Sequence, residues 1–192
     1  AYGQTPETGK TLDILFSHDT HSHLNAFTTV VEDEEADIGG FARANTLIKA
    51  QRAKNPDTLV IDGGDFSMGT LIQTVFETQA AELRMLGYMG YDVTTFGNHE
   101  FDYGMARAKA VIKEADFPYV SCNWVDLRTG FNVLPSVKFF FVGGRKIAFV
   151  GVTTPETFTK STPTYFQDAN GKFVYSFAEG NNGADLYNKV QE

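Results

Sequence analysis

The segment Gly97-Asn98-His99-Glu100-Phe101-Asp102 decides the fold and the chemistry, because it places an amide, an imidazole and carboxylates directly after an apolar run. Two other polar segments follow apolar runs in the same way. Asp19-Thr20-His21 follows residues 12–16, and Gly63-Gly64-Asp65 follows residues 58–61. Three predicted strands therefore end in side chains suited to one kind of chemistry, metal-assisted reaction at phosphate.

The composition limits the class of protein. A chain of 192 residues with 42% hydrophobic content can bury one sizeable core. Its formal net charge of -8 and the lack of a basic stripe argue against a nucleic-acid polymer as partner. The single cysteine, Cys122, excludes an internal disulfide, and no apolar run has the length of a membrane span. An anionic substrate would need a local positive site, which a metal ion supplies.

The first two thirds of the chain alternate between strand-like and helix-like patterns. This alternation predicts a mostly parallel α/β sheet with helices on its faces and a ligand site beyond the carboxyl ends of the strands. The expected strands cover residues 12–16, 59–61, 93–96 and 119–121, and the expected helices cover residues 41–54, 71–89 and 105–115.

The last third has a different pattern. Residues 137–142 and 146–152 flank Gly143-Gly144-Arg145, which predicts a hairpin that begins a second β layer. Residues 153–182 are expected to form a long loop with one strand near residues 173–177, and residues 184–191 the first turns of a helix. The acidic stretch at residues 32–37 predicts a solvated loop and lacks the spacing of a calcium-binding loop.

The polar segments contain the ligands that divalent cations prefer, namely carboxylate, imidazole and amide oxygen. A two-metal site needs one bridging carboxylate, and Asp65 is the natural candidate. Asp19 and His21 would then complete the protein ligands of the first metal, and Asn98 would bind the second. His99 remains free to act on the phosphoryl group or the leaving oxygen. We expect Asp102 to hold its tautomer and Glu100 to point elsewhere.

Each segment has a simpler interpretation when taken alone. Asp19 and His21 could belong to an ordinary polar loop, and Gly63-Gly64-Asp65 could be a tight turn. Asn98 and Asp102 are also common residues at helix N-termini. The coincidence of three segments favours the metal site. Arg43 is more typical of a surface salt bridge than of a residue that orients active-site groups.

These residues resemble the metallophosphoesterase superfamily, and the continuation Gly97 to Gly104 is similar to its 5′-nucleotidase family in particular. Residues 38–43 and 151–156 are similar to further segments of that family. The resemblance implies an α/β/β/α sandwich, a site for two divalent metal ions (Mn, Zn, Co or Fe), secretion or a periplasmic or cell-surface location, and a separate C-terminal nucleotide-binding domain. The family's metal ligands match Asp19, His21, Asp65 and Asn98, and its catalytic pair matches His99 and Asp102.

Two departures from the family pattern stand out. His18 occupies a position where the family has a small polar residue, so it either adds an imidazole near the metals or packs at the strand end. The family also uses two further histidine ligands from later loops, whereas the four histidines here all precede Phe101. We therefore expect residues 1–192 to be a single, truncated N-terminal domain that lacks the nucleotide-binding domain.

The expected sandwich is consequently incomplete, with the first sheet, its helices and the start of the second sheet. It should hold one metal ion or none, expose apolar surface and self-associate. The parent enzyme would hydrolyse phosphate esters of nucleotides as a 5′-nucleotidase or a nucleotide-sugar hydrolase, with this chain weakly active or inactive. The alternatives are a 2′,3′-cyclic-nucleotide phosphodiesterase/3′-nucleotidase and a non-catalytic phosphate-binding fragment. Asp102 favours the 5′-nucleotidase branch, where the cyclic-nucleotide branch often has Asn.

Overall fold

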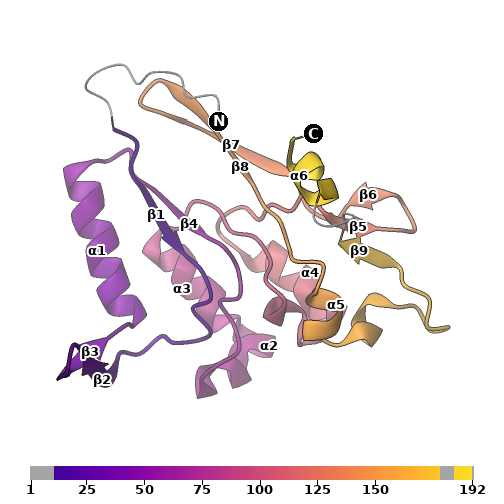
Figure 1. Ribbon diagram of the computed structural model, residues 1–192, viewed down its shortest axis with the longest axis horizontal. Helices are drawn as coiled ribbons and strands as arrows, with labels where there is room; N and C mark the ends of the chain where they lie inside the picture. Colours follow the sequence, from indigo (N-terminus) through magenta and orange to yellow (C-terminus); the bar gives the residue numbers. More distant parts are fainter. Residues whose placement is uncertain (1–10, 178–183, 192) are drawn as a thin grey trace.

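A parallel strand pair forms the centre of the fold. The computed structural model describes residues 11–177 and 184–191 (Figure 1). Strand β1 (Ile14–Ser17) pairs in parallel with β4 (Leu59–Asp62), with Ser17 opposite Asp62. Parallel bridges from Ile61 to Val93 and from Thr94 to Tyr119 continue the sheet. The predicted parallel α/β arrangement is confirmed, although residues 93–96 and 119–121 contribute bridges and not full strands.

Helices pack beside this sheet. α1 (Phe41–Lys54) and α3 (Ala81–Met89) contact each other next to β1 and β4. α4 (Gly104–Glu114) follows the segment Gly97 to Asp102. The prediction of one helix over residues 71–89 is wrong. The segment divides into the 3-10 helix η1 (Leu71–Val75), α2 (Phe76–Gln79) and α3.

The break at Ala80 has two local causes. Ala80 adopts the left-handed conformation with φ of 44°, which interrupts the regular helix. No residue of η1 is buried, and Leu71 is 88% exposed. The apolar stripe that suggests a single long helix therefore does not extend to its predicted start.

The solvated loop predicted at residues 32–37 is also wrong. The strands β2 (Phe27–Val31) and β3 (Glu34–Ile38) form an antiparallel hairpin that projects from the body in Figure 1. Its two-residue turn, Glu32-Asp33, has positive φ at both positions, which suits the right-handed twist of the strands. The β-branched run in β2 favours a strand and outweighs the acidic composition of β3.

The second half of the chain adds antiparallel strands. β7 (Val137–Val142) and β8 (Arg145–Val150) form the predicted hairpin, closed by Gly143-Gly144. The predicted loop 153–182 contains α5 (Thr157–Lys160), η3 (Pro163–Phe166) and β9 (Tyr175–Phe177), and its residues 178–183 lie outside the described residues. β9 pairs with β5 (Trp124–Asp126), whose other neighbour is β6 (Phe131–Asn132). The predicted helix is present as α6 (Ala184–Gln191).

A cluster of aromatic side chains packs around Phe101, within the segment Gly97 to Asp102. Phe101 is fully buried, and its ring centroid lies 5.1 Å from that of Phe96, 5.0 Å from Trp124 and 5.2 Å from Phe166. Phe177 completes the cluster at 5.5 Å. Rings at these distances bury large apolar areas and add edge-to-face attraction. The core therefore holds the residues on either side of Phe101 in place.

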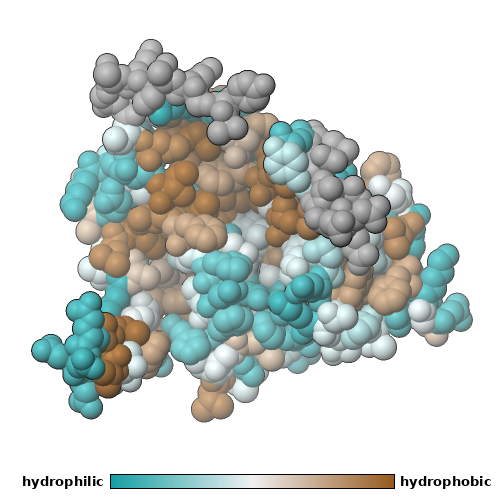
Figure 2. Space-filling model, in the orientation of Figure 1, coloured by the Kyte–Doolittle hydropathy of each residue, from teal (hydrophilic) through white to brown (hydrophobic). Residues whose placement is uncertain are grey.

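Apolar side chains are exposed on two separate strand pairs, β1–β4 and β7–β8. Alternate residues of β1, Ile14 and Phe16, are 41% and 65% exposed, and on β7 Phe139 and Phe141 are 44% and 78% exposed. Figure 2 shows hydrophobic side chains gathered over the region of β1, β4, β7 and β8. This exposure matches the apolar surface expected from an incomplete sandwich, while self-association stays a prediction.

Candidate metal centre

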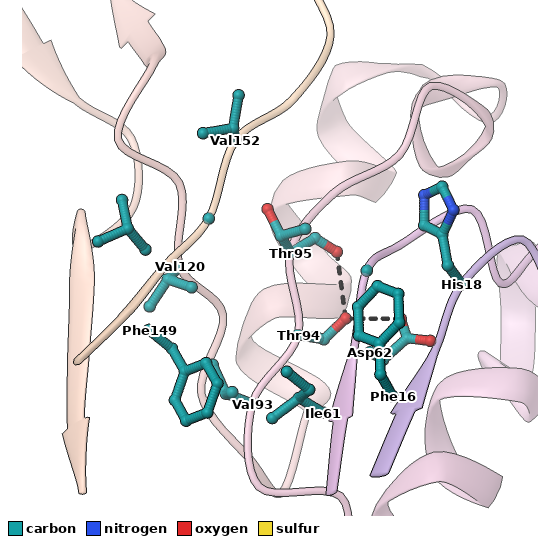
Figure 3. Close-up of a pocket in the computed structure, with 13 residues that line it drawn as sticks. Phe16, His18, Ile61, Asp62, Val93, Thr94, Thr95, Val120, Phe149 and Val152 are labelled. Carbon is teal, nitrogen blue, oxygen red and sulfur yellow. Dashed lines mark hydrogen bonds between the residues drawn. The ribbon is translucent and has the colours of Figure 1, made fainter. Parts of the chain in front are cut away.

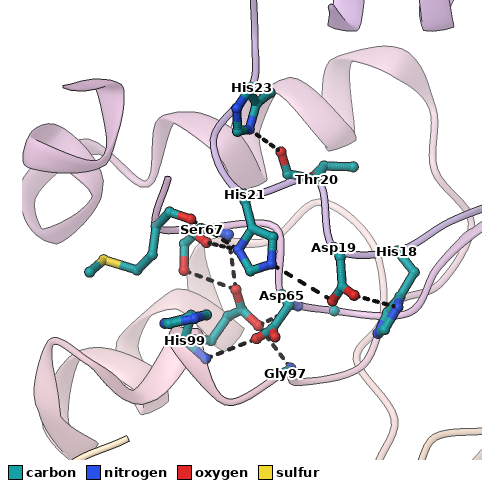
Figure 4. Close-up of polar contacts among 12 residues, drawn as sticks. His18, Asp19, Thr20, His21, His23, Asp65, Ser67, Gly97 and His99 are labelled. Atoms are coloured by element: carbon teal, nitrogen blue, oxygen red, sulfur yellow. Dashed lines mark hydrogen bonds and ion pairs between the residues drawn. The ribbon is translucent and has the colours of Figure 1, made fainter. Parts of the chain in front are cut away.

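The loops after β1 and β4 run side by side beyond the sheet. Backbone hydrogen bonds continue the pairing there, from Asp19 N to Gly64 O (3.1 Å) and from His21 N to Asp65 O (3.1 Å). As a result, Asp19, His21 and Asp65 each offer a ligand atom within 4.8 Å of the others. Figure 4 shows these three side chains converging, with His99 close by. The sequence predicted this grouping, and the geometry brings it together.

The same three residues have an unusual backbone conformation. Asp19, His21 and Asp65 have φ values of 53°, 43° and 54°, in the left-handed region. For residues with a Cβ this conformation costs about 1 to 2 kcal/mol each, and such strain concentrates at functional sites. The surrounding hydrogen bonds hold the loops in this form, which turns all three side chains toward one point.

The tautomer of His21 follows from its neighbours. Its Nδ1 atom lies 3.0 Å from the carbonyl oxygen of Met68 and 3.2 Å from that of Ser67. Carbonyl oxygens only accept hydrogen bonds, so Nδ1 carries the proton. Nε2 is then left with its lone pair, and it faces Asp19 Oδ1 at 4.0 Å. A histidine oriented by a carbonyl in this way is suited to bind a metal.

Asn98 lies against Asp65. Both residues are buried, and the amide of Asn98 lies 3.2 Å from Asp65 Oδ2. The amide satisfies its neighbours when its NH₂ group donates to Asp65 Oδ2 and its oxygen accepts from the backbone N–H of His99 at 3.3 Å. The opposite orientation presents the amide oxygen, which is the atom that a divalent cation would bind. The position of Asn98 therefore fits a second metal bound through Asp65.

His99 and Asp102 form a close pair at the edge of the centre. Nδ1 of His99 lies 2.6 Å from Asp102 Oδ2, and Ser161 Oγ donates to Asp102 Oδ1 at 2.7 Å. The ring of His99 stands edge-on to that of His21, with centroids 5.2 Å apart. Ser161 was not predicted from the sequence, because it lies 59 residues from Asp102 in a segment expected to be a loop.

The two residues considered for a supporting role, His18 and Arg43, have different surroundings. His18 Nδ1 is 3.2 Å from Asp19 Oδ2, and the His18 ring stacks on Phe16. His18 therefore packs at the strand end and lies beside a candidate ligand, while a role at the metals stays a prediction. Arg43 instead donates to the backbone carbonyl of Asp37 and has its Nη2 3.8 Å from the Asp37 carboxylate. Arg43 therefore forms a surface salt bridge to Asp37 of β3, which is the simpler of the two interpretations of this residue.

Glu100 is fully buried and lies next to the backbone of Asp65. Its carboxylate accepts hydrogen bonds from the backbone N–H groups of Asp65 and Gly97, both at 2.8 Å, and from the N–H (3.1 Å) and hydroxyl (2.9 Å) of Ser67. Burial, followed by the charge of Asp65, raises the pKa of Glu100 to about 7. The sequence predicted only that Glu100 points away from the catalytic pair. Three of its donors are backbone groups, which leave no signature in a sequence.

Two glycines allow the motif loops to touch. A Cβ on Gly64, whose φ is 88°, would lie 2.5 Å from the backbone nitrogen of Gly97. A Cβ on Gly97 would lie 2.0 Å from Asp65 Oδ1. Real Cβ atoms do not approach other atoms this closely, so both positions need glycine for space, and Gly64 needs it for conformation as well.

Two hollows lie near the centre. One, of about 280 Å³, lies between the β1–β4 pair and β8 and is lined by residues that include His18, Asp62 and Thr95 (Figure 3). Burial raises the pKa of Asp62, which accepts from Ser17 Oγ, Gly64 N and Thr94 Oγ1. The other, of about 680 Å³, lies beside Asp19 between α1 and the β2–β3 hairpin. Asp19 therefore lies at the edge of a mostly apolar hollow.

The donors taken together fit a divalent cation. Carboxylates and a single imidazole suit Mn, Zn, Co or Fe, and the tautomer of His21 leaves the lone pair that such an ion requires. The fold and the grouping of these donors are typical of metal-dependent phosphoesterases. The calcineurin-like phosphoesterase family matches residues 13–186, and the chain belongs to this family.

The relatives of this chain agree with this family assignment. The chain is 31% identical over 169 residues to the snake venom 5′-nucleotidase of Gloydius brevicauda, a match that covers 79% of this chain and 27% of the relative. It is 35% identical over 125 residues to a 2′,3′-cyclic-nucleotide 2′-phosphodiesterase/3′-nucleotidase of Haemophilus influenzae, covering 62% of this chain and 19% of the relative.

A solved structure confirms the fold class. The structure of Haemophilus influenzae NAD nucleotidase is similar with a TM-score of 0.75 at 27% identity, and the match covers 94% of this chain and 32% of that one. The described residues therefore have a metallophosphoesterase-type α/β fold, of which they form a part. The chain spans about a third or less of the length of these relatives.

Proposed function

We propose that the protein hydrolyses phosphate esters of nucleotides with the help of divalent metal ions, with residues 1–192 by themselves weakly active. The observation that supports this most directly is the group formed by Asp19, His21 and Asp65, whose ligand atoms lie within 4.8 Å of one another. Asn98 adjoins this group, and the pair His99–Asp102 lies at its edge. Metal ligands and a candidate proton donor thus meet at one place.

The chemistry divides between ions and side chains. When bound, a pair of divalent ions lowers the pKa of a bound water to about 7 and neutralises charge on phosphate oxygens. Asp19, His21 and Asp65 would hold one ion, and Asp65 with Asn98 would hold the other. His99 donates a hydrogen bond from Nδ1 to Asp102 Oδ2, which keeps Nε2 directed outward. When the ring carries a second proton, on Nε2, that proton can pass to the leaving oxygen of the ester.

The substrate class rests on the relatives. Their names include 5′-nucleotidases and a cyclic-nucleotide phosphodiesterase, so we assign nucleoside 5′-monophosphates first and 2′,3′-cyclic nucleotides second. Within the described part of the chain, none of the helices has both the length and the apolar character needed to cross a bilayer. A venom enzyme among the relatives supports secretion or a cell-surface location for the protein.

The test is hydrolysis by the metal-stripped chain after Mn²⁺ is added back. Phosphate release from AMP, 2′,3′-cyclic AMP and p-nitrophenyl phosphate would be measured for the wild type, Asp65→Asn and the surface control Asp57→Asn. We expect Mn²⁺-dependent release from AMP that is lost in Asp65→Asn and kept in Asp57→Asn. Preference for the cyclic ester would favour the second substrate class. Release that is independent of metal, or unchanged in Asp65→Asn, would contradict the proposal.

A second candidate function is binding of phosphate with little turnover. For residues 1–192 by themselves it is supported by one observation, namely that their four histidines all precede Phe101, whereas the family resemblance implies two later ones. Tight Mn²⁺ and phosphate binding without release of phosphate from any of the three esters would support it. The same preparations can be examined by light scattering, where a monomer at high concentration would contradict the predicted self-association.

A further inference from the structure

We propose that Glu100 is a positioning residue for the metal centre, which fixes the loop carrying Asp65 against the turn carrying Asn98. Its functional consequence rests on the proposed function, since the centre is the one assigned there. The inference adds a residue whose side chain reaches neither metal nor substrate but determines where the ligands stand.

The hydrogen bonds of Glu100 connect the loop that carries Asp65 with the segment Gly97 to Asp102. One carboxylate oxygen, Oε2, accepts from Asp65 N and from Gly97 N, both at 2.8 Å. The other, Oε1, accepts from both donor groups of Ser67. Asp65 is the shared ligand, and Gly97 directly precedes Asn98. One side chain therefore holds the backbone on both sides of the point where the second ion would bind.

A return contact closes this arrangement into a ring. Asp65 Oδ1 accepts from the backbone N–H of His99 at 2.9 Å, so the turn that contains Glu100 also holds the side chain of Asp65 (Figure 4). The backbone of Asp65 is fixed by Glu100 and its carboxylate by His99 N. Because Asp65 has the strained φ of 54°, loss of the first contact would let the loop relax and move the carboxylate.

Only glutamate satisfies these donors. Four donor groups point at two oxygens, so both oxygens of the carboxyl group act as acceptors. Glutamine would replace one oxygen with an NH₂ group that faces N–H donors, leaving two buried donors unpaired. Aspartate is one methylene shorter. The burial of Glu100 also excludes water as a substitute acceptor.

The experiment measures Mn²⁺ affinity of the full chain by calorimetry for three variants. Glu100→Gln removes two acceptor contacts, and Ser67→Ala removes only the hydroxyl bond to Oε1. Val111→Ala is the matched control, because Val111 is fully buried in α4 and makes none of these contacts. Each protein is measured at the same interval below its own melting temperature, so that lost stability alone does not change the result.

We expect the Kd for Mn²⁺ to rise about tenfold or more in Glu100→Gln and roughly threefold in Ser67→Ala, as is usual when a residue supporting a ligand is lost. Val111→Ala should melt earlier yet bind within about twofold of wild type. If Glu100→Gln does not fold, Ser67→Ala decides, and a Kd equal to that of wild type would overturn the inference. So would a rise in Val111→Ala as large as in Ser67→Ala.

A second readout needs neither metal nor turnover. Amide hydrogen exchange should accelerate at Asp65, Ser67 and Gly97 in Glu100→Gln more than at other amides, whereas Val111→Ala should accelerate exchange broadly. Unchanged exchange at Asp65 would overturn the inference even if no metal bound. A wild type that binds Mn²⁺ but hydrolyses nothing would refute the proposed function and leave the role of Glu100 to be decided by these measurements.

Discussion

Nδ1 of His99 lies 2.6 Å from Oδ2 of Asp102, and the other oxygen of the same carboxylate accepts from Ser161 Oγ. The carboxylate therefore has a hydroxyl on one side and an imidazole on the other. This contact holds Nδ1 of His99 as the donor to the carboxylate and directs Nε2 outward, where it can carry the proton that is transferred.

Asp102→Asn should therefore remove catalysis without removing metal. A neutral amide in place of the carboxylate would no longer stabilise the positive charge of the doubly protonated His99 ring, so Nε2 would be a poorer proton donor. We expect phosphate release from AMP to fall about 100-fold or more, with the Mn²⁺ Kd within twofold of wild type. Nitrogen chemical shifts of the His99 ring would report the tautomer directly. An unchanged rate and an unchanged tautomer would contradict the assigned role.

His21 and His23 allow a matched test of the metal centre. His21 directs Nε2 toward Asp19, whereas His23 has its Nδ1 3.2 Å from the carbonyl oxygen of Thr20 and lies outside the ligand group. His21→Ala should weaken Mn²⁺ binding about tenfold or more, and His23→Ala should change it less than twofold. The measurement is a calorimetric titration of both variants. Equal effects would show that the ligand group is wrongly assigned.

Gly64→Ala should destabilise the protein more than Gly144→Ala. Both glycines have positive φ, 88° and 78°, so both variants incur the left-handed conformation of alanine. Only Gly64 also meets a backbone atom, Gly97 N at 2.5 Å, while nothing lies within 4 Å of a Cβ on Gly144. We expect an additional loss of about 1 to 3 kcal/mol in unfolding free energy for Gly64→Ala, measured with urea. Similar losses would contradict the predicted close approach.

The acid stability of the chain should depend on Arg128. Hydrogen bonds from Arg128 lower the pKa of Asp126 to about 2, from an ordinary value of 3.8. A lowered pKa means that the unfolded chain binds the proton more readily. The stabilisation is therefore present above about pH 4 and is lost as the pH falls through 2.

Arg128→Gln should thus be less stable than wild type at pH 7, and the difference should shrink between pH 4 and pH 2. Urea unfolding at pH 7, 4, 3 and 2 measures this, with the exposed Lys113→Gln as a control for loss of a positive charge. A difference that stays constant over the whole pH range would refute the explanation.

The sequence predicted the parts of the fold that depend on local pattern and strand ends. Apolar runs followed by Asp19, Asp65 and Asn98 were sufficient to expect one site, because neighbouring parallel strands end at the same edge of a sheet. The hairpin at Gly143-Gly144 was predictable because two glycines between apolar strands favour a two-residue turn.

Other parts depend on contacts between distant residues. β5 pairs with β9 across about fifty positions, as in Trp124 with Phe177, and no local pattern announces that partner. The break at Ala80 depends on exposure of the preceding turn. Glu100 was missed as a supporting residue because backbone amides have no identity in a sequence, although its position in the motif was plain.

The left-handed backbone at Asp19, His21 and Asp65 also determines how this centre can be transplanted by protein design. Copying the three side chains onto a regular helix or strand would not reproduce it, because their directions come from a conformation that those elements do not contain. A host scaffold would have to receive both loops together with the carboxylate that supports them. A design would therefore have to transfer a folded fragment of backbone together with the donor atoms.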